Sequence, residues 1–156
     1  MSCVLYIVVY RGRALRCSSG RVDKEARLSW TGSGLVFDGG APGGPQIVID
    51  GDCAVGPSPM DLVLMGVAAC MAIDVKVILE KGRVPFDGLD VRAEGERREK
   101  PPRSYRAVRL VFTVTGVPPA SRARVDRAIE LSREKYCSVL FSLREDLVVD
   151  TVIEGG

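Results

Sequence analysis

The sequence predicts an α+β fold in which short strands precede a long apolar helix, and a strand hairpin and further helices follow it. Three observations carry this prediction: a strong helix start at residue 58, regular alternation of apolar and polar residues in two later segments, and short strand candidates before the helix. Strands that occur in runs, with helices between the runs, favour α+β over a βαβ-alternating fold. The length of 156 residues suffices for one domain with its own core.

Charge and hydropathy exclude several classes of protein. The formal net charge of +2 is too close to neutral for an obvious nucleic-acid or membrane-surface protein, so we expect no nucleic acid and no membrane among its partners. The apolar run at residues 3–10 is far shorter than the roughly 20 residues of a membrane-spanning helix. Its flanks also differ from those of a signal peptide.

The histidine and cysteine counts narrow the possible chemistry. The chain contains no histidine, which excludes Ser-His-Asp and Cys-His catalysis and most catalytic zinc sites. The cysteine count is odd and there is no C-x-x-C pair, which argues against a secreted disulfide framework and a structural zinc site. We therefore expect a cytoplasmic protein. The five cysteines are Cys3, Cys17, Cys53, Cys70 and Cys137.

Residues 1–25 differ in character from the rest of the chain. An apolar run is followed there by a segment rich in arginine, serine and glycine, which predicts a poorly packed N-terminal extension. The domain proper is expected to span residues 26–156. Its first part contains three short strand candidates, residues 26–30, 35–38 and 46–50, separated by Gly-rich turns.

A long helix is predicted next, because Ser58 can cap it, Pro59 suits its first position and Asp61 can complete a capping box. The helix should run to about Lys81 and end at Gly82. Residues 62–73 offer almost no polar side chain to water, so the helix should be central and buried.

The second half of the chain predicts a hairpin, two helices and a closing strand. Alternation over residues 89–94 and 107–114, with a charged Pro-containing turn at 96–104, indicates a long antiparallel hairpin. Arginines between residues 92 and 109 are interleaved with glutamates, which favours a solvated hairpin with cross-strand ion pairs. Further elements are expected as a helix with Val125, Ala128, Ile129 and Ser132 on one face, a shorter helix at 138–144 and a strand at 147–153.

Cys70 and Cys137 are the candidate reactive groups. Cys70 lies more than two turns into the long helix, so it is either a small buried apolar side chain or a thiol activated by a charged partner. Cys137 lies just before a helix start, where backbone N–H groups favour an anion. Asp61 is either a helix cap, the favoured interpretation, or a group that orients a cation near Cys70. We find no phosphate loop, dinucleotide fingerprint or metal-ligand cluster.

Two segments around these cysteines resemble the signatures of a known family. Residues 56–62, reading Gly-Pro-Ser-Pro-Met-Asp-Leu, and residues 68–75 around Cys70 look like the first-cysteine signature of the OsmC/Ohr family. Residues 131–139, which include Lys-Tyr-Cys-Ser, look like its second-cysteine signature, and residues 29–32 and 95–97 also fit. The resemblance covers about residues 26–153 and is strongest to the OsmC-like branch.

The resemblance implies a fold, an assembly and an activity. The fold is α+β, with strongly bent antiparallel sheets around a central buried helix, in an intertwined homodimer whose active sites lie at the subunit interface. The activity is thiol-dependent reduction of organic hydroperoxides in oxidative-stress defence. Cys70 attacks the peroxide, Cys137 resolves the product as a disulfide, and a dithiol reductant restores both thiols without a metal or organic cofactor.

The chain departs from the family pattern at two positions. Peroxide-reducing members carry an activating arginine in the turn after the first strand, whereas residues 31–35 here contain none; Arg27 or an arginine of the partner chain would have to replace it. Asp61 also stands where the family often has glutamate. Two alternatives therefore stay open: a non-catalytic dimer that binds a small apolar ligand, and a protein that exchanges thiols or persulfides.

Overall fold

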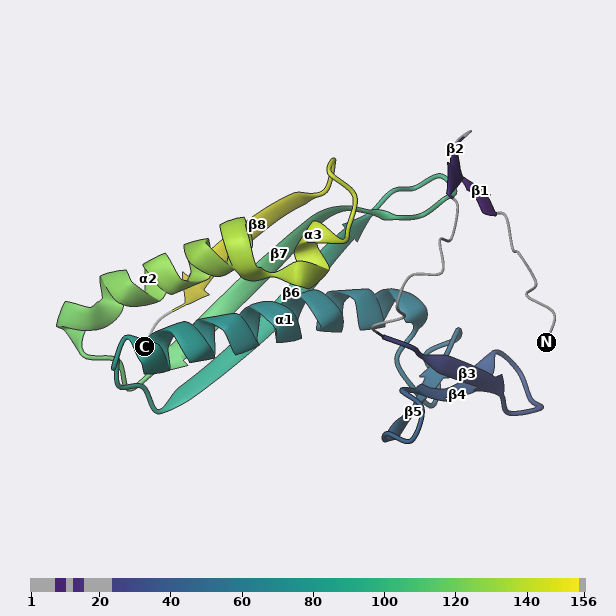
Figure 1. Cartoon of the computed structure of the whole chain (residues 1–156), viewed down its shortest axis with the longest axis horizontal. Helices are drawn as coiled ribbons and strands as arrows, with labels where there is room; N and C mark the ends of the chain where they lie inside the picture. Colours follow the sequence, from purple (N-terminus) through teal and green to yellow (C-terminus); the bar gives the residue numbers. More distant parts are fainter. Residues whose placement is uncertain (1–7, 11–12, 16–23, 155–156) are drawn as a thin grey trace. The chain divides into compact units, whose positions relative to one another are not determined.

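The computed structural model describes residues 8–10, 13–15 and 24–154, which form two compact units divided between Gly56 and Pro57 (Figure 1). Much of the predicted extension, residues 1–25, lies outside the described residues, so its character stays a prediction.

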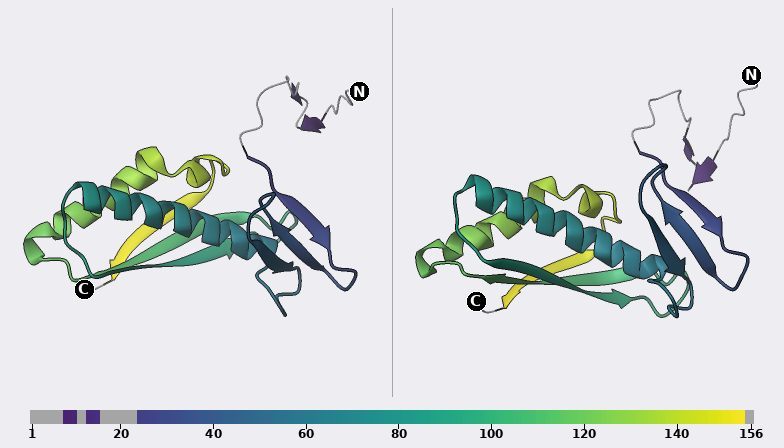
Figure 2. Two further views of the ribbon diagram at one scale, coloured as in Figure 1. Left: turned by 60° about the horizontal axis from the view of Figure 1, so that its bottom comes forward. Right: turned by 90° about the horizontal axis from the view of Figure 1, so that it is seen from below.

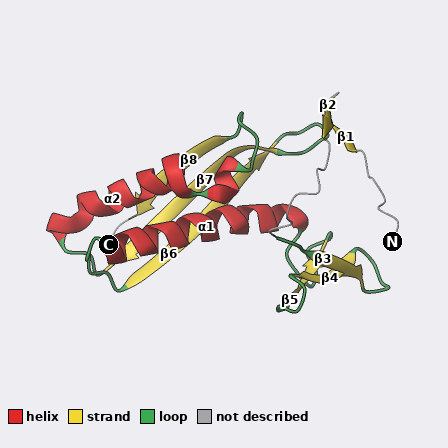
Figure 3. Cartoon of the chain, viewed as in Figure 1, coloured by secondary structure: helices red, strands yellow, loops and turns green. Residues whose placement is uncertain are grey.

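The first unit consists of strands and loops (Figure 3). Strands β1 (Val8–Tyr10) and β2 (Arg13–Leu15) form an antiparallel pair. Strands β3 (Arg27–Trp30), β4 (Val36–Gly40) and β5 (Gln46–Asp50) form an antiparallel sheet in that order. The three predicted strands are thus present, and β4 extends two residues further than predicted because Gly39 and Gly40 still pair with β3 and β5.

The second unit places two helices on one face of a three-stranded sheet (Figure 2). The sheet has the order β6-β7-β8, and the helices α1 and α2 lie side by side over it. A π-helical turn, Ser132–Tyr136, joins α2 to the short helix α3. In chain order the elements are α1 (Pro59–Lys81), β6 (Gly88–Arg97), β7 (Tyr105–Thr115), α2 (Arg122–Leu131), α3 (Ser138–Phe141) and β8 (Val148–Glu154).

The predicted hairpin is confirmed, but the sheet is not antiparallel throughout. Strands β6 and β7 pair antiparallel, with Val91 opposite Phe112. Strand β8 runs parallel to β7, with Thr151 opposite Leu110. This corrects the expectation of antiparallel sheets. The physical reason is that α2, the π turn and α3 together form a crossover long enough to return the chain to the same end of the sheet.

The core of this unit lies between α1, α2 and the inner face of β7. Helix α1 contributes a ridge of buried residues spaced four apart, Val67, Met71, Val75 and Leu79. Four alternating residues of β7, Val108, Leu110, Phe112 and Val114, belong to the same cluster, as do Val125, Ala128 and Ile129 of α2. The predicted buried face of α2 is therefore confirmed, including Ser132 just beyond it.

Helix α1 is less buried than its sequence predicted. Met65 and Ile73 on its other side are 57% and 62% exposed, because the sheet and α2 together cover only part of its circumference. By length and composition α1 is also sufficient to cross a membrane, which the sequence analysis overlooked. Its buried ridge against β7 and α2 is that of a core helix.

The two ends of α1 are capped by different hydrogen-bond motifs. At the start, the Ser58 and Asp61 side chains each accept a hydrogen bond from the other residue's backbone N–H, so the predicted capping box is confirmed. At the end, Gly82 has an ordinary helical φ of −75°, and the left-handed residue is Arg83, at φ 52°. The N–H groups of Arg83 and Val84 donate to the carbonyls of Glu80 and Leu79 in a Schellman motif.

The position of Arg83 predicts a stabilising substitution. Arg83→Gly should raise the free energy of unfolding by about 0.5–1 kcal/mol, because the strain of a non-glycine residue in this region exceeds the entropy that glycine loses on folding. Arg83→Ala is the matched control, since it removes the same exposed side chain but keeps the left-handed strain. Urea denaturation of the three proteins provides the measurement, and equal stability of both variants would contradict the assignment.

Candidate functional site

The structure brings Cys70 and Cys137 together within the second unit. Cys70 is half-buried on α1, and Cys137 is fully buried at the junction between the π turn and α3. The Cys70 side chain lies beside the Cys137 thiol and helps to raise its pKa, and both cysteines are free thiols. Helices α1 and α3 pack against each other, so two residues that are distant in the sequence become direct neighbours.

Local backbone geometry fixes the Cys137 thiol. The π turn ends with the N–H of Cys137 donating to the carbonyl of Ser132 at 2.9 Å, which widens the helix by one residue. Cys137 then leaves the helical conformation, with φ −68° and ψ 89°, and acts as the N-cap of α3. Its sulfur accepts the N–H of Leu140 at 3.4 Å. The thiol is therefore held by hydrogen bonds on both sides of a helix junction.

The surroundings of Cys137 favour its protonated form. Burial, as the largest cause, together with the Cys70 side chain and the Asp74 carboxylate, raises the pKa of this thiol from its ordinary 9.0 to about 11. The Leu140 N–H acts in the opposite direction. The sequence analysis expected the helix start to favour an anion here. The structure corrects this, because one N–H donor does not compensate for the loss of water.

Asp74 and Ser132 belong to the same cluster, and the sequence analysis did not select them. The Ser132 hydroxyl donates to the Asp74 carboxylate at 2.8 Å, and Ser132 is fully buried. Asp74 lies one helical turn after Cys70, so both residues occupy the same side of α1. Two signals could have identified the pair: a carboxylate four positions from the first cysteine, and a serine on the otherwise apolar face of α2.

Asp61 lies at the start of α1, and its capping interpretation is confirmed. Its carboxylate accepts hydrogen bonds from the Ser58 N–H at 3.0 Å and from the Ser58 hydroxyl at 2.7 Å. It stands nine positions before Cys70 on the same helix, a rise of about 14 Å along the axis. The alternative role of orienting a cation near Cys70 stays a prediction.

Tyr105 ties the hairpin to this end of α1. Its hydroxyl donates to the Met60 carbonyl at 3.0 Å, and its ring occupies the space that a side chain at Gly95 would need. Burial, and then the nearby Asp61 charge, raise the pKa of Tyr105, while Arg97 lowers it. Gly95 belongs to the segment noted for its family resemblance, and the contact explains why glycine stands there.

The arginine-rich hairpin forms ion pairs on the outer face of the sheet. Arg109 of β7 pairs with Asp150 of β8 at 3.3 Å, Arg106 pairs with Glu96, and Arg92 pairs with Glu94 and Glu154. The predicted solvated hairpin with ion pairs between strands is therefore confirmed. Exposed pairs of this kind contribute about 0–1 kcal/mol each to stability.

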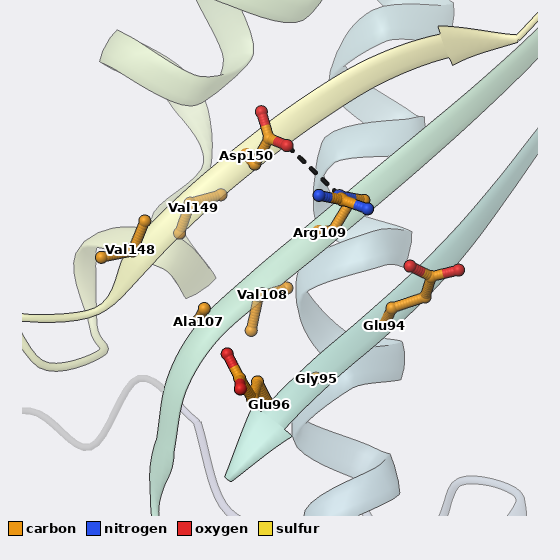
Figure 4. Close-up of a pocket in the computed structure, with 9 residues that line it drawn as sticks. All are labelled: Glu94, Gly95, Glu96, Ala107, Val108, Arg109, Val148, Val149 and Asp150. Carbon is orange, nitrogen blue, oxygen red and sulfur yellow. Dashed lines mark hydrogen bonds and ion pairs between the residues drawn. The ribbon is translucent and has the colours of Figure 1, made fainter. Parts of the chain in front are cut away.

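A groove of 680 Å³ lies among these charged residues, and it is separate from the thiols. Glu94, Glu96, Arg109 and Asp150 project from the face of the sheet that points away from the helices (Figure 4). Its lining contains no cysteine. Within residues 8–10, 13–15 and 24–154, no group of three histidine, cysteine or acidic side chains is arranged to hold a metal ion.

Comparison with known proteins identifies the family. The family model described as OsmC-like protein matches residues 50–152. This chain is a member of the OsmC-like family. Protein YhfA of Escherichia coli strain K12 is 44% identical over 122 residues, which cover 78% of this chain and 90% of YhfA. The resemblance to OsmC/Ohr proteins seen in the sequence is thereby confirmed.

Solved structures extend the similarity to the fold. A hypothetical protein from Aquifex aeolicus VF5 is 28% identical, with a TM-score of 0.74 over 86% of this chain and 96% of that protein. An organic hydroperoxide resistance protein OsmC from Legionella pneumophila, also described as a predicted redox protein, has a TM-score of 0.64 over 88% of this chain and all of that one. At 13% identity, the second similarity concerns the fold alone.

The family arginine has no counterpart in the turn between β3 and β4. Residues 31–35 read Thr-Gly-Ser-Gly-Leu, and the turn is closed by hydrogen bonds from Thr31 to Val36. Arg27, the substitute considered from the sequence, pairs with Glu25 at 2.8 Å within the first unit. The carboxylate of Asp74 is a charged side chain that acts on the Cys137 thiol, where it raises the pKa.

Proposed function

We propose that this protein is a thiol-dependent hydroperoxide reductase in which Cys70 attacks the peroxide and Cys137 resolves the product. The observation that carries the proposal is the adjacent pair of thiols, in which Cys137 is buried and has a raised pKa while Cys70 is partly accessible. A buried thiol with a raised pKa is a poor first nucleophile. It is suited to react second, with a sulfur atom that is already beside it.

The proposed reaction has three balanced steps. The Cys70 thiolate attacks the terminal oxygen of the hydroperoxide, the O–O bond breaks, and the alkoxide takes a proton to leave as alcohol. Cys137 then attacks the Cys70 sulfenic acid, and the hydroxide leaves with the proton of Cys137 as water. A dithiol reductant attacks the resulting disulfide and restores both thiols by exchange, becoming a disulfide itself.

A second candidate is thiol or persulfide exchange with a sulfur electrophile. Two observations favour it: the turn at residues 31–35 lacks the arginine of the peroxide-reducing members, and a carboxylate, Asp74, acts on the Cys137 thiol. Attack on a disulfide requires the same two thiols, with a thiolate leaving in place of an alkoxide. A protein that only binds a small apolar ligand is the third candidate, and the reactions of the cysteine variants distinguish it from the other two.

We further propose that the protein acts as a cytoplasmic homodimer. The exposed side of α1 carries an apolar stripe, Met65, Ala69, Ile73 and Val77, at the helical spacing of one continuous face. Exposed contiguous apolar surface of this kind is typical of an interface. A second copy of the chain is the occupant that the family resemblance implies, and the stripe lies on the same helix as Cys70.

Peroxide titration tests the proposed reaction. Reduced protein treated with one equivalent of cumene hydroperoxide should lose two hydrogens, and peptide mapping should show a Cys70–Cys137 bridge. The reaction should be about tenfold faster than with hydrogen peroxide, because an apolar substituent adds binding energy. Stopped-flow measurement of the rate and intact mass under denaturing conditions provide the readouts.

Cysteine variants separate the candidate functions. Cys70→Ser should abolish peroxide consumption, Cys137→Ser should stop at a sulfenic acid on Cys70, and Cys53→Ser, which changes an exposed cysteine outside the second unit, should change neither. A wild-type protein that keeps both thiols in excess peroxide but exchanges with a small disulfide would establish the second candidate. Thiols that react with neither reagent would favour the binding protein.

The dimer predicts the effect of one substitution on α1. Ile73→Glu should convert a dimer into a monomer at micromolar concentration, because a carboxylate would have to be buried without a partner. Val148→Glu is the control, since it places the same charge on an exposed valine of β8. Sedimentation velocity distinguishes the species. A wild-type monomer, or a dimer unaffected by Ile73→Glu, would contradict the proposed interface.

A further inference from the structure

We propose that Asp74 is a positioning residue that, through Ser132, holds the turn carrying Cys137 against Cys70. The inference rests on the proposed function, since it assigns a role to Asp74 in the step that joins the two thiols. Asp74 acts through its hydrogen bond with Ser132 and through its charge.

Ser132 connects α1 to the backbone of Cys137 with two hydrogen bonds. Its hydroxyl donates to the Asp74 carboxylate at 2.8 Å, and its carbonyl accepts the Cys137 N–H at 2.9 Å. Asp74 and Cys70 are one turn apart on α1. Cys70 therefore lies on the same helix as Asp74, which anchors the turn of Cys137. Ser132 connects that helix to the Cys137 backbone.

Burial makes this bridge strong. Ser132 is fully buried among the apolar residues Val125, Ala128 and Ile129 of α2, and Asp74 is half-buried. A hydrogen bond to an ionised carboxylate is roughly twice as strong as one between neutral groups. Loss of either partner leaves a poorly hydrated polar group, so the π turn has a strong preference for the observed position.

The charge of Asp74 has a second effect on the same thiol. It is one of the causes that raise the pKa of Cys137, together with burial and Cys70. Helix α1 contributes Cys70 and Asp74 to the surroundings of Cys137, α3 contributes the Leu140 N–H, and the π turn contributes Ser132. Asp74 therefore adds to the effect of burial in favouring the protonated form of Cys137, which limits premature reaction of the second thiol.

The experiment measures the resolving step without peroxide. In a protein with Cys3→Ser, Cys17→Ser and Cys53→Ser, Cys70 is converted to a mixed disulfide with thionitrobenzoate. The Cys137 thiolate then attacks the Cys70 sulfur, the mixed disulfide breaks, and thionitrobenzoate leaves as a coloured thiolate. Its release is followed from pH 7 to 11. The variants are Ser132→Ala, Asp74→Asn and Asp74→Ala, with Glu80→Gln as a carboxylate-to-amide control elsewhere on α1.

Each variant has a distinct expected result. Ser132→Ala should slow release about tenfold or more at every pH, because the thiol is no longer held in place. Asp74→Asn keeps an oxygen for the Ser132 hydroxyl but removes the charge, so its pH midpoint should fall and its release at neutral pH should be faster. Asp74→Ala should combine the lower midpoint with a slower maximal rate, and Glu80→Gln should match the parent protein.

A purely structural role gives a different pattern. It predicts lower melting temperatures for Ser132→Ala and Asp74→Ala, with unchanged release rates and an unchanged midpoint for Asp74→Asn, and this result would overturn the inference. Failure of the proposed function is separate: if the parent protein releases thionitrobenzoate but consumes no peroxide, the reductase assignment fails and the role of Asp74 stands. If the parent protein turns over peroxide normally and all variants release thionitrobenzoate like the parent, the reductase assignment stands and the role of Asp74 fails.

Discussion

The contact between one ridge of α1 and the inner face of β7 is the interaction on which the second unit depends. Val67, Met71, Val75 and Leu79 are spaced four residues apart, and each is at most 1% exposed. Burial of such side chains contributes about 2 kcal/mol each. Cys70 and Asp74 directly precede two members of this ridge, so the packing that stabilises the unit also sets the direction of both functional side chains.

The same packing buries the second thiol, Cys137, and thereby determines its protonation. A buried thiol costs little when neutral and much when charged, which is why burial dominates the ionisation of Cys137. The half-buried Cys70 faces more water, and its neighbour can donate a hydrogen bond to it. The two cysteines thereby acquire different roles from their surroundings, although they are chemically identical and lie in direct contact.

Much of this fold was predictable because its signals are local. The capping box at Ser58 and Asp61, the alternation in the hairpin and the buried face of α2 each lie within a few residues of sequence. The strand direction of β8 was missed because alternation carries no information about direction. The helix end at Gly82 was predicted correctly, whereas the left-handed conformation at Arg83 had no signal in the sequence.

The thiol site was predictable only in part. The family resemblance selected Cys70 and Cys137, and the fold places them together. The bond between Asp74 and Ser132 joins residues that are 58 positions apart, so the local signal at each residue does not indicate its partner. The environment of Cys137 was misjudged because a helix start is visible in sequence, while burial and a carboxylate on another helix arise from tertiary packing.

The most direct test of the thiol pair is a pH titration of the protein with cysteines carbon-labelled at Cβ, followed by nuclear magnetic resonance. The Cys137 signal should stay at its protonated position through pH 9 and move near the pKa of about 11. In a Cys70→Ala variant its midpoint should fall, because Cys70 contributes to the shift. If the Cys137 signal titrates near its ordinary value of 9.0, and its midpoint is the same in Cys70→Ala, the two thiols are not paired.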